Sequence, residues 1–456
     1  MSISPSLKTL KVVVVGGGAA GFFAAIAAAT HPHTRVILLE AGRQPLAKVR
    51  ISGGGRCNVT HACFDPPVFV QNYPRGSKAL RGPFSRFQAR DTVEWFARRG
   101  VELKTEADGR MFPITDDSAT IVDCLLSNAR NAGVEIRTGT PVEQASCLLA
   151  ANSQTPVERG YCLLPNFHGA LPNFHGALPN PNSQFEIKLK SGEVLRSDRL
   201  ILATGSSPQG HRIAKDLGHS IVTPVPSLFT FNLKDERLED LAGVSVANVR
   251  LRLGDKKSGK SKNLEQTGPV LITHWGLSGP AVLKLSAWGA RFLSDRRYRA
   301  NLLINWLPQY NREELREQLQ LRRGKEKKAI ANSCPFPLPR RLWESFLKAA
   351  AIDSQQPWAE LSNKSIDRLV GELSSGKYQI KGKGVFKEEF VTCGGVSLKE
   401  VNFKTMESRL CPGLYLAGEV LDLDGVTGGF NFQSAWTTGW LAGSGIASSI
   451  SPGPSV

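Results

Sequence analysis

The sequence lacks the patterns of several common protein classes. Its eight cysteines are irregularly spaced and include no C-x-x-C pair, which argues against a zinc ribbon, a disulfide framework and a dithiol redox centre. We therefore expect a reducing, cytoplasmic setting and no metal site. The one long apolar run, residues 12–29, is interrupted by four glycines, so we expect neither a targeting segment nor a membrane span.

Acidic residues are scarce relative to basic ones. The 456 residues include 57 Lys and Arg but 40 Asp and Glu, a net charge of +17. Residues 250–383 hold 26 Lys and Arg against 12 Asp and Glu, a net charge of +14, and the rest of the chain carries only +3. A surface that binds a polyanion concentrates positive charge in this way. The alternative is a charged surface that contacts only solvent.

Glycines gather in a turn near the start of the chain. A valine-rich strand over 11–15 precedes G-x-G-x-x-G at residues 16–21, an Ala-rich helix over 19–30 and a strand over 35–39. In this arrangement glycines allow a tight turn and close approach to a pyrophosphate, whose charge the helix N-terminus stabilises. An acid after the second strand suits ribose hydroxyls. The predicted cofactor residues here are Gly16, Gly18, Ala19, Ala20, Gly21 and Glu40.

Two later motifs favour FAD over NAD. Residues 200–205 resemble the A-T-G signature of two-dinucleotide-binding flavoproteins, and residues 412–419 resemble their second flavin signature. An NAD dehydrogenase has no need of the second motif, whereas FAD reaches across the sheet. We therefore predict an α/β fold with a Rossmann-type FAD-binding domain. The cofactor residues predicted from these motifs are Ala203, Thr204, Gly205, Gly418 and Glu419.

Five segments resemble one family, the HI0933-like flavoproteins, also called the BaiN/RdsA type. They are residues 51–60, 109–113, 273–280, 391–396 and 418–431, and they span nearly the whole chain in order. The resemblance implies an FAD-dependent, NAD(P)-linked oxidoreductase. Its FAD-binding domain, residues 1–220 and 384–456, is interrupted by a β-rich domain, residues 221–310, and a basic helical domain, residues 311–383. The chain departs from the family at His61, where relatives usually have asparagine, and in a shorter turn after the A-T-G motif.

Two further glycine-rich segments supply candidate flavin contacts. Residues 425–433 lead into a last helix, predicted over 429–446, whose N-terminus points at the flavin in such proteins and stabilises negative charge on it. Residues 52–58 run beside the pyrophosphate in this topology, where a guanidinium neutralises phosphate charge. The candidates are Gly428, Gly429, Phe430 and Asn431 in the first segment, and Ser52, Gly53 and Arg56 in the second.

Three residues are candidates for substrate chemistry. Cys57 is the predicted acid that protonates a substrate carbon opposite the hydride, and a small packing residue is the alternative. Arg110, in the 109–113 segment, is predicted to contact substrate, with the flavin as the alternative. His274, in the 273–280 segment, is predicted to contact substrate, although a lone histidine is more often structural.

The remaining patterns predict local structure. Helices are expected over 85–99 and 119–131, strands over 385–391 and 414–417, and a basic helical region over 311–373. Residues 164–180 contain a duplicated seven-residue unit with Pro and Gly in each copy, which indicates a surface loop.

Two functions are consistent with these features. The resembled family includes a ribosomal-RNA dihydrouridine synthase, and the basic region favours RNA as a partner through residues 250–383. Its candidate base-stacking residues are Trp275, Trp306, Trp343 and Trp358, although core packing is the more common role for most such tryptophans. We therefore predict reduction of a uridine in ribosomal RNA, with NAD(P)H as a transient reductant. The alternatives are a small-molecule, NAD(P)H-linked flavin oxidoreductase, as the bile-acid branch of the family implies, and a non-catalytic RNA-binding flavoprotein.

Overall fold

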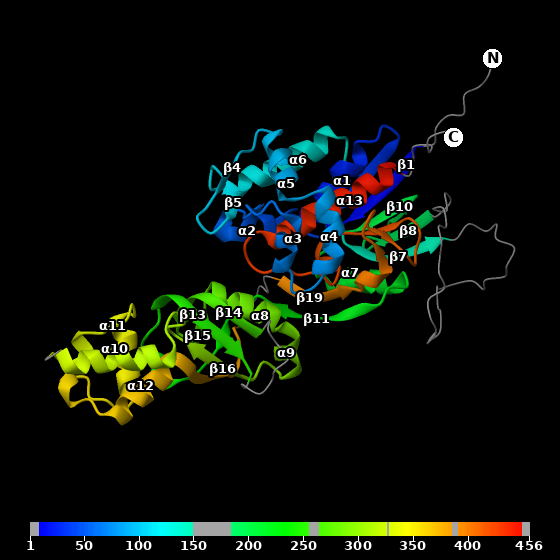
Figure 1. Ribbon diagram of the computed structural model, residues 1–456. Helices are drawn as coiled ribbons and strands as arrows, with labels where there is room; N and C mark the ends of the chain where they lie inside the picture. The colour runs from blue at the N-terminus through cyan, green and yellow to red at the C-terminus, as the bar shows by residue number, and fades with distance from the viewer. Residues whose placement is uncertain (1–8, 149–183, 255–263, 326–327, 385–390, 449–456) are drawn as a thin grey trace, which may run out of the picture. The chain divides into compact units, whose positions relative to one another are not determined.

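The computed structural model describes residues 9–148, 184–254, 264–325, 328–384 and 391–448. The chain divides into two units: residues 1–224 with 394–456 form unit 1, and residues 225–393 form unit 2 (Figure 1). Strand β11 (Ile221–Ser227) leads into unit 2, strand β19 (Val391–Val396) leads back, and the two strands pair with each other. The division of unit 2 into two domains near residue 310 stays a prediction.

Unit 1 is built on a seven-stranded sheet with the order β20-β21-β22-β10-β1-β2-β6. The pairs β1–β2, β1–β10, β10–β22 and β2–β6 are parallel. Val12, Val13 and Val14 in β1 have no exposed surface, as expected for a parallel strand covered on both faces. This sheet and its helices confirm the predicted Rossmann-type α/β fold. The strands are β1 (Leu10–Val15), β2 (Thr34–Leu39), β6 (Glu135–Arg137), β10 (Arg199–Leu202), β20 (Val401–Asn402), β21 (Glu407–Ser408) and β22 (Leu414–Leu416).

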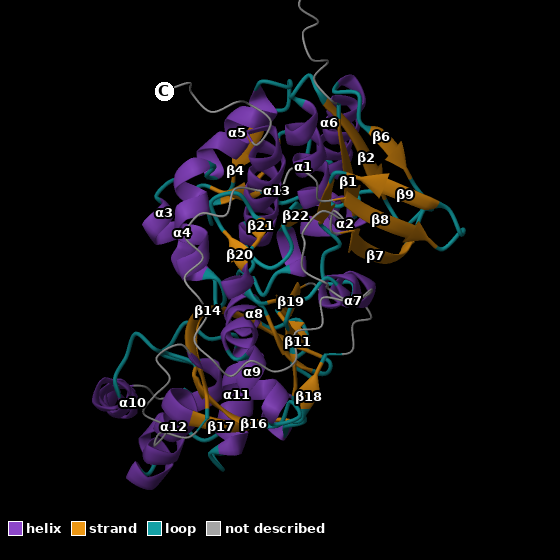
Figure 2. Ribbon diagram, turned by 90° about the vertical axis from the view of Figure 1, so that its right-hand side faces the viewer, coloured by secondary structure: helices purple, strands orange, loops and turns teal. Residues whose placement is uncertain are grey.

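Helices and two small antiparallel sheets accompany this main sheet, as Figure 2 shows. One small sheet has the order β3-β5-β4, and the other has the order β7-β8-β9. Their strands are β3 (Thr60–His61), β4 (Leu103–Thr105), β5 (Arg110–Pro113), β7 (Val142–Leu148), β8 (Gln184–Leu189) and β9 (Val194–Ser197). The α-helices of unit 1 are α1 (Ala19–Ala29), α2 (Ala47–Gly55), α3 (Pro66–Phe69), α4 (Ser77–Arg86), α5 (Ala89–Ala97), α6 (Ser118–Asn131), α7 (Pro208–Asp216) and α13 (Phe430–Ser448).

Two glycines of α13 allow it to pack closely on α1, and Figure 1 shows these helices side by side. A Cβ atom added to Gly439 would lie 2.4 Å from the carbonyl oxygen of Ala20. One added to Gly443 would lie 2.3 Å from the carbonyl oxygen of Ala24. Both distances are far below van der Waals contact, so the first and last helices of unit 1 meet through glycine.

The prediction of one helix over residues 85–99 is wrong. The chain forms α4 and α5 there, separated at Phe87, whose backbone is extended with φ −147° and ψ 97°. Gln88 and Asp91 then form a capping box that begins α5, with the Gln88 backbone N–H donating to the Asp91 carboxylate at 2.7 Å. The duplicated unit at 164–180, and residues 385–390 of the strand predicted over 385–391, lie outside the described residues.

Unit 2 contains a barrel with the strand order β17-β16-β13-β14-β15-β12-β18. Its two outer strands, β17 and β18, are nearly continuous in sequence. β17 pairs with β16 at one end of the strand order, and β18 pairs with β12 at the other end. The segment that contains β17 and β18 therefore joins the two edges of the sheet and closes it into a barrel. The strands are β12 (Phe231–Asn232), β13 (Ser245–Leu253), β14 (Glu265–Thr273), β15 (Gly276–Ser278), β16 (Ala300–Asn305), β17 (Gly376–Ile380) and β18 (Gly382–Lys383).

The helical part of unit 2 is organised around buried tryptophans. Trp306, Trp343 and Trp358 have no exposed surface, and their indole N–H groups donate to Tyr378, Ile330 and Ser333. These three are therefore core residues. Of the four predicted base-stacking residues only Trp275 is accessible, with 44% of its surface exposed. The α-helices of unit 2 are α8 (Pro280–Trp288), α9 (Ala290–Asp295), α10 (Arg312–Lys325), α11 (Arg340–Ala349) and α12 (Asn363–Ser375).

Within the described part of the chain, no helix combines the length and apolarity that a membrane crossing requires.

The α1–α13 contact predicts a contrast between two Gly→Ala substitutions in unit 1. G443A forces a methyl group against Ala24 and is expected to lower the free energy of unfolding by about 1–3 kcal/mol. G82A, in α4, meets no atom within 4 Å and is expected to leave stability unchanged or raise it by up to about 1 kcal/mol. Urea denaturation followed by circular dichroism measures both, and equal stabilities would contradict the glycine-mediated contact.

Candidate cofactor site

Four parallel strands of unit 1 end at one edge of the sheet. Since β1, β2, β10 and β22 are mutually parallel, the residues that follow them lie along the same edge. These are the turn beginning at Gly16, then Glu40, Ala203 and the segment beginning at Ala417. The fold thus gathers four separate predicted cofactor segments at the place where doubly wound α/β proteins bind nucleotides.

The turn between β1 and α1 requires its glycines and leaves a space above one of them. Gly16 has φ +111°, and a Cβ there would lie 2.4 Å from the Ala203 carbonyl oxygen. A Cβ on Gly21 would lie 1.9 Å from the Gly16 carbonyl oxygen, whereas one on Gly18 would meet no atom within 4 Å. Gly18 caps α1 without a side-chain hydrogen bond, and the first turn contains no acid. The helix N-terminus therefore presents its N–H groups at an open position suited to a phosphate.

Glu40 joins this turn to the segment that follows β2. One carboxylate oxygen accepts a hydrogen bond from the backbone N–H of Gly17, and the other accepts one from Gly42, both at 2.7 Å. The Leu46 N–H donates to the Gly17 carbonyl at 2.8 Å and brings the chain back to the turn. A carboxylate oxygen accepts more than one hydrogen bond, so Glu40 retains capacity for ribose hydroxyls.

The segment after β22 approaches the same turn. A Cβ on Gly418, which has φ +74°, would lie 2.9 Å from the Ala20 side chain. The neighbouring Glu419 forms an ion pair with Lys48 at 2.6 Å, and a Cβ added to Gly205 would lie 3.7 Å from a carboxylate oxygen of Glu419. Lys48 had no predicted role, because its partner is 371 residues away in sequence.

A second glycine turn leads into α13. Gly428 and Gly429 have φ +127° and +91°, and a Cβ on Gly429 would lie 2.4 Å from the Thr60 carbonyl oxygen. The Asn431 amide exchanges hydrogen bonds with the backbone of Gly425, at 2.8 and 2.9 Å, so it holds the turn in shape. The ring of Phe430 stacks on His61 with centroids 4.7 Å apart. His61, the departure from the family pattern, thus packs beside this turn.

Arg56 and Arg110 are linked through the carboxylate of Glu106, a residue that had no predicted role. Glu106 accepts a hydrogen bond from Arg56 at 2.7 Å with one oxygen, and from Arg110 at 2.8 Å with the other. The Arg56 guanidinium also lies 4.0 Å from the centre of the Phe112 ring and pairs with Asp116 at 3.4 Å. These partners orient Arg56 and compensate part of its charge, so its predicted phosphate contact stays a prediction.

Cys57 lies at the end of the 52–57 glycine segment and is fully buried. Its φ of +61° is unusual for a residue other than glycine and marks a tight turn. Burial raises the pKa of the Cys57 thiol to about 12, against a lowering contribution from its hydrogen bond with Ser52. The raised pKa makes the thiol a weaker acid than an exposed cysteine, and the side chain has no exposed surface. Its predicted catalytic role stays a prediction.

A buried ion pair anchors the loop between β22 and α13. Two nitrogens of the Arg75 guanidinium donate to the two carboxylate oxygens of Asp424, whose side chain is completely buried. Beside it, the Tyr73 hydroxyl donates to the Phe430 carbonyl, and the Val426 N–H donates to the Asn72 carbonyl at 2.9 Å. These contacts hold in place the chain segment that leads to Gly428. No local sequence pattern predicts them, because their partners are far apart in the sequence.

His274 lies in unit 2, in the turn between β14 and β15, and is exposed together with Trp275. Its predicted contact with substrate stays a prediction. Among the residues that the structure describes, no three His, Cys, Asp or Glu side chains gather where they would hold a metal ion.

The parallel sheet, the glycine turn and the acid after β2 define a Rossmann-type dinucleotide-binding protein. Comparison with known proteins gives the family. Residues 10–158 match the HI0933-like protein Rossmann domain, and residues 225–391 match the HI0933-like protein barrel and H2TH domain. The chain belongs to the HI0933-like family and is an FAD-dependent oxidoreductase.

Three curated relatives align over nearly the full length of both chains. The ribosomal RNA dihydrouridine synthase of Escherichia coli is 30% identical, covering 91% of this chain and 92% of its own. The 3-dehydro-bile acid delta(4,6)-reductase of Clostridium scindens is 28% identical, covering 93% and 96%. The ribosomal RNA dihydrouridine synthase of Haemophilus influenzae is 27% identical, covering 90% and 92%.

The residues at the sheet edge fit FAD. The open position at Gly18 and the uncapped start of α1 suit a pyrophosphate, and Glu40 suits a ribose. The second glycine turn, at Gly428 and Gly429, allows close backbone approach near the N-terminus of α13.

This fit predicts that G18V removes the cofactor without unfolding the protein. The valine side chain would occupy the open position, and the φ of Gly18, −92°, is accessible to valine. We expect FAD affinity to fall at least about tenfold, equal to about 1.4 kcal/mol, with the thermal midpoint of the flavin-free protein unchanged. Visible flavin absorbance of the purified variant measures the loss, and a normal flavin content would contradict the placement of the pyrophosphate at Gly18.

Proposed function

We propose that this enzyme transfers a hydride to a carbon–carbon double bond, and that its substrate is a uridine in ribosomal RNA, which becomes dihydrouridine. NAD(P)H is the proposed source of electrons. It docks transiently, because the sequence contains no second G-x-G-x-x-G motif.

The concentration of positive charge in unit 2 is the observation that carries this proposal. Residues 250–383 have a net charge of +14, and the rest of the chain, including all of the cofactor-binding unit, has +3. An enzyme that binds RNA uses such a concentration of positive charge to neutralise many phosphates, whereas a small-molecule substrate offers few charges to neutralise. The two dihydrouridine synthases among the relatives agree with this assignment.

The proposed reduction adds one hydride and one proton across the C5–C6 bond of the uracil ring. Bound FAD supplies the hydride from N5 of its flavin ring. The chain contributes the glycine turns that position the cofactor, and the N-terminal dipole of α13, which favours negative charge nearby. Cys57 is the proposed donor of the proton, because reduction of a double bond needs an acid opposite the hydride, and it must act against the raised pKa of its buried thiol.

A small-molecule substrate is the second candidate. The bile acid reductase from Clostridium scindens is nearly as similar as the E. coli dihydrouridine synthase, 28% against 30% identity. Sequence identity therefore does not separate the two candidates, and the charge of unit 2 is the observation that supports RNA.

Deletion of the gene is expected to remove dihydrouridine from one or more positions in ribosomal RNA. Reverse-transcription mapping of RNA from cells with and without the gene measures this, and re-expression of the wild-type chain restores the signal. Re-expression of G18V, which lacks the space for the pyrophosphate, is expected to fail. An unchanged dihydrouridine profile in the deletion strain would rule out the ribosomal substrate.

The role of Cys57 predicts a selective defect in C57A. Loss of a general acid slows proton transfer by roughly 10²–10⁴-fold, so oxidation of the reduced enzyme by an RNA substrate should slow by this factor. Reduction of the enzyme by NAD(P)H should keep its wild-type rate. C63A is the matched control, because Cys63 lies six residues away and is only partly buried. Rapid-mixing absorbance measures both rates, and equal oxidation rates in C57A and C63A would assign Cys57 to packing.

A further inference from the structure

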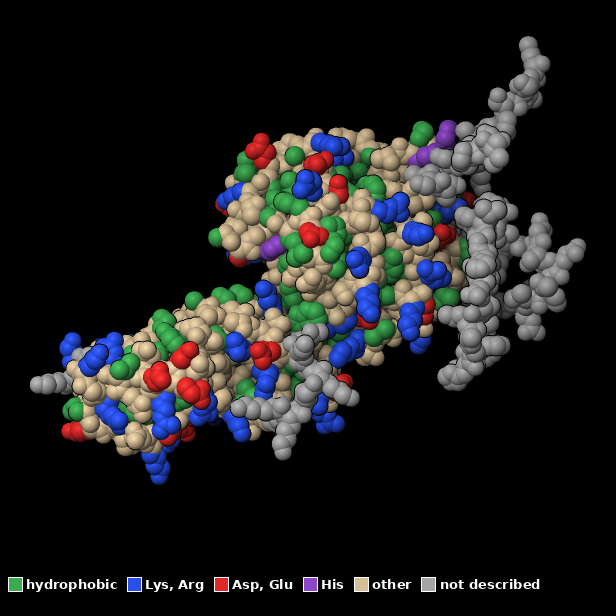
Figure 3. Space-filling view, in the orientation of Figure 1, with side chains coloured by type: hydrophobic (Ala, Val, Ile, Leu, Met, Phe, Trp, Pro, Cys, Tyr) green, Lys and Arg blue, Asp and Glu red, His purple; other side chains and the backbone are tan. Residues whose placement is uncertain are grey.

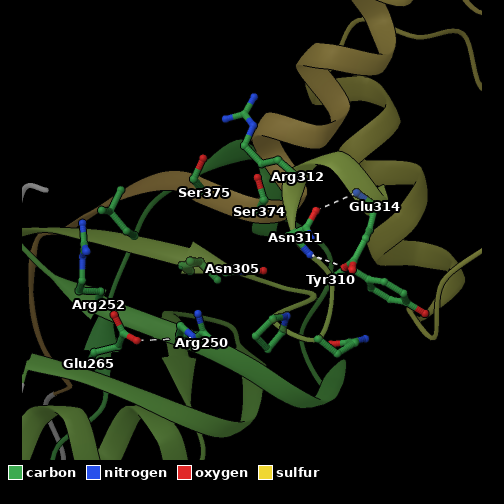
Figure 4. A pocket seen from close by; sticks show the side chains of 14 residues that line it. Arg250, Arg252, Glu265, Asn305, Tyr310, Asn311, Arg312, Glu314, Ser374 and Ser375 are labelled. Carbon is green, nitrogen blue, oxygen red and sulfur yellow. Dashed lines mark hydrogen bonds and ion pairs between the residues drawn. The ribbon is translucent and has the colours of Figure 1, made fainter. Parts of the chain in front are cut away.

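Unit 2 contains a cavity that shares no residue with the candidate cofactor site. Its volume is about 570 Å³, and it lies between the barrel and the helical part of the unit (Figure 4). Strands β13, β14 and β16 form one wall, and the start of α10 with the end of α12 forms the other. A cavity of this size is in the range that holds small organic ligands.

Among the residues that the structure describes, Arg252 and Arg312 of this cavity form no ion pair, although Glu265 lies opposite Arg252 in the β13–β14 register. Arg252, in β13, has a buried Nη2 atom without an acceptor, and Arg312 begins α10. A buried guanidinium N–H without an acceptor is costly, so Arg252 points to an anion that completes its hydrogen bonds. The third arginine, Arg250, pairs with Glu265 at 3.6 Å. The other acid, Glu314, accepts the backbone N–H of Asn311 at 2.8 Å in a helix cap.

The rest of the lining suits a base and a sugar. The Asn305 side-chain oxygen accepts the Leu307 N–H at 3.0 Å, which leaves its NH₂ group for a ligand acceptor. Tyr310 presents a half-buried ring, which packs against Phe336 with centroids 5.6 Å apart. Ser374 donates its hydroxyl hydrogen to Val370 and keeps its oxygen as an acceptor. Figure 4 shows Asn305 on the barrel wall and Ser374 and Tyr310 toward the helices.

We infer that this cavity binds one nucleotide unit between its two walls, with phosphate groups at Arg252 on the barrel wall and at Arg312 on the helical wall, and with the base toward Tyr310. The inference rests on the proposed function and deepens it, because it assigns one nucleotide of a single-stranded RNA segment to a specific place in unit 2. Guanidinium groups pair with phosphate oxygens, and aromatic rings stack on bases without regard to sequence.

The wider surface of unit 2 does not supply an equivalent site on the face seen in Figure 3. Lys and Arg side chains lie there among acidic ones rather than in a continuous patch. The cavity is concave, and its lining includes the ring of Tyr310 and two arginines, Arg252 and Arg312, that form no ion pair with a described residue. It therefore fixes a nucleotide in position, whereas scattered surface charges attract the polyanion without orienting it.

The test measures binding of a fluorescent, 5′-phosphorylated oligouridine to the FAD-loaded enzyme at several salt concentrations. R252M and R312M are each expected to weaken binding about tenfold. Each is also expected to reduce the slope of log affinity against log salt by about 0.7, the value for one phosphate contact in a single strand. The control is R316M, one turn further along α10, because Arg316 pairs with Asp367 at 3.2 Å and does not line the cavity.

Uridine monophosphate distinguishes RNA from a free nucleotide as the occupant. Binding of both ligands, weakened by R252M and R312M but not by R316M, supports the inference. If the monophosphate binds in a cavity-dependent way and the oligonucleotide does not, the nucleotide site stands and the RNA function fails. If the oligonucleotide binds equally to wild type, R252M and R312M, the cavity assignment is overturned and the RNA function stands. Because Arg312 is exposed, R312M tests the site even if R252M impairs folding.

Discussion

Close approach of backbone to backbone at the edge of the parallel sheet is the constraint on which unit 1 depends. Gly16 contacts the segment after β10, Gly21 contacts Gly16, and α13 meets α1 through Gly439 and Gly443. Each contact excludes a Cβ atom, and together they bring segments more than 180 residues apart in sequence to one edge. The position above Gly18 is left open in this otherwise crowded turn, and it fits the phosphates of FAD.

Local patterns were sufficient for the parts of the fold that are local. The β1–α1–β2 unit was predictable because its glycine spacing, valine strand and terminal acid are constrained within 30 residues. The break between α4 and α5 was missed, because residues 85–99 have a helical apolar pattern and the break depends on the capping box at Gln88. Propensity alone does not show where one helix stops and the next begins.

The candidate site was predictable in its glycines but not in its ion pairs. Lys48 with Glu419 and Arg75 with Asp424 join residues 371 and 349 positions apart, and no spacing rule relates such residues. Glu106, which links Arg56 to Arg110, lies just outside the 109–113 motif. Such pairs arise only when the fold brings distant loops together, so a structure is needed to find them. For the tryptophans of unit 2, core packing was the more common expectation, and the structure shows which three belong to the core.

The two units have separate proposed tasks. Unit 1 holds the cofactor, and unit 2, which carries most of the excess positive charge, binds the nucleic acid substrate. The most direct test is a single turnover under anaerobic conditions, in which the NADPH-reduced enzyme is mixed with unmodified ribosomal RNA. The account predicts that the RNA oxidises the flavin and gains one dihydrouridine for each flavin oxidised. Persistence of the reduced flavin in the presence of RNA, together with its rapid oxidation by an unsaturated small molecule, would contradict the account.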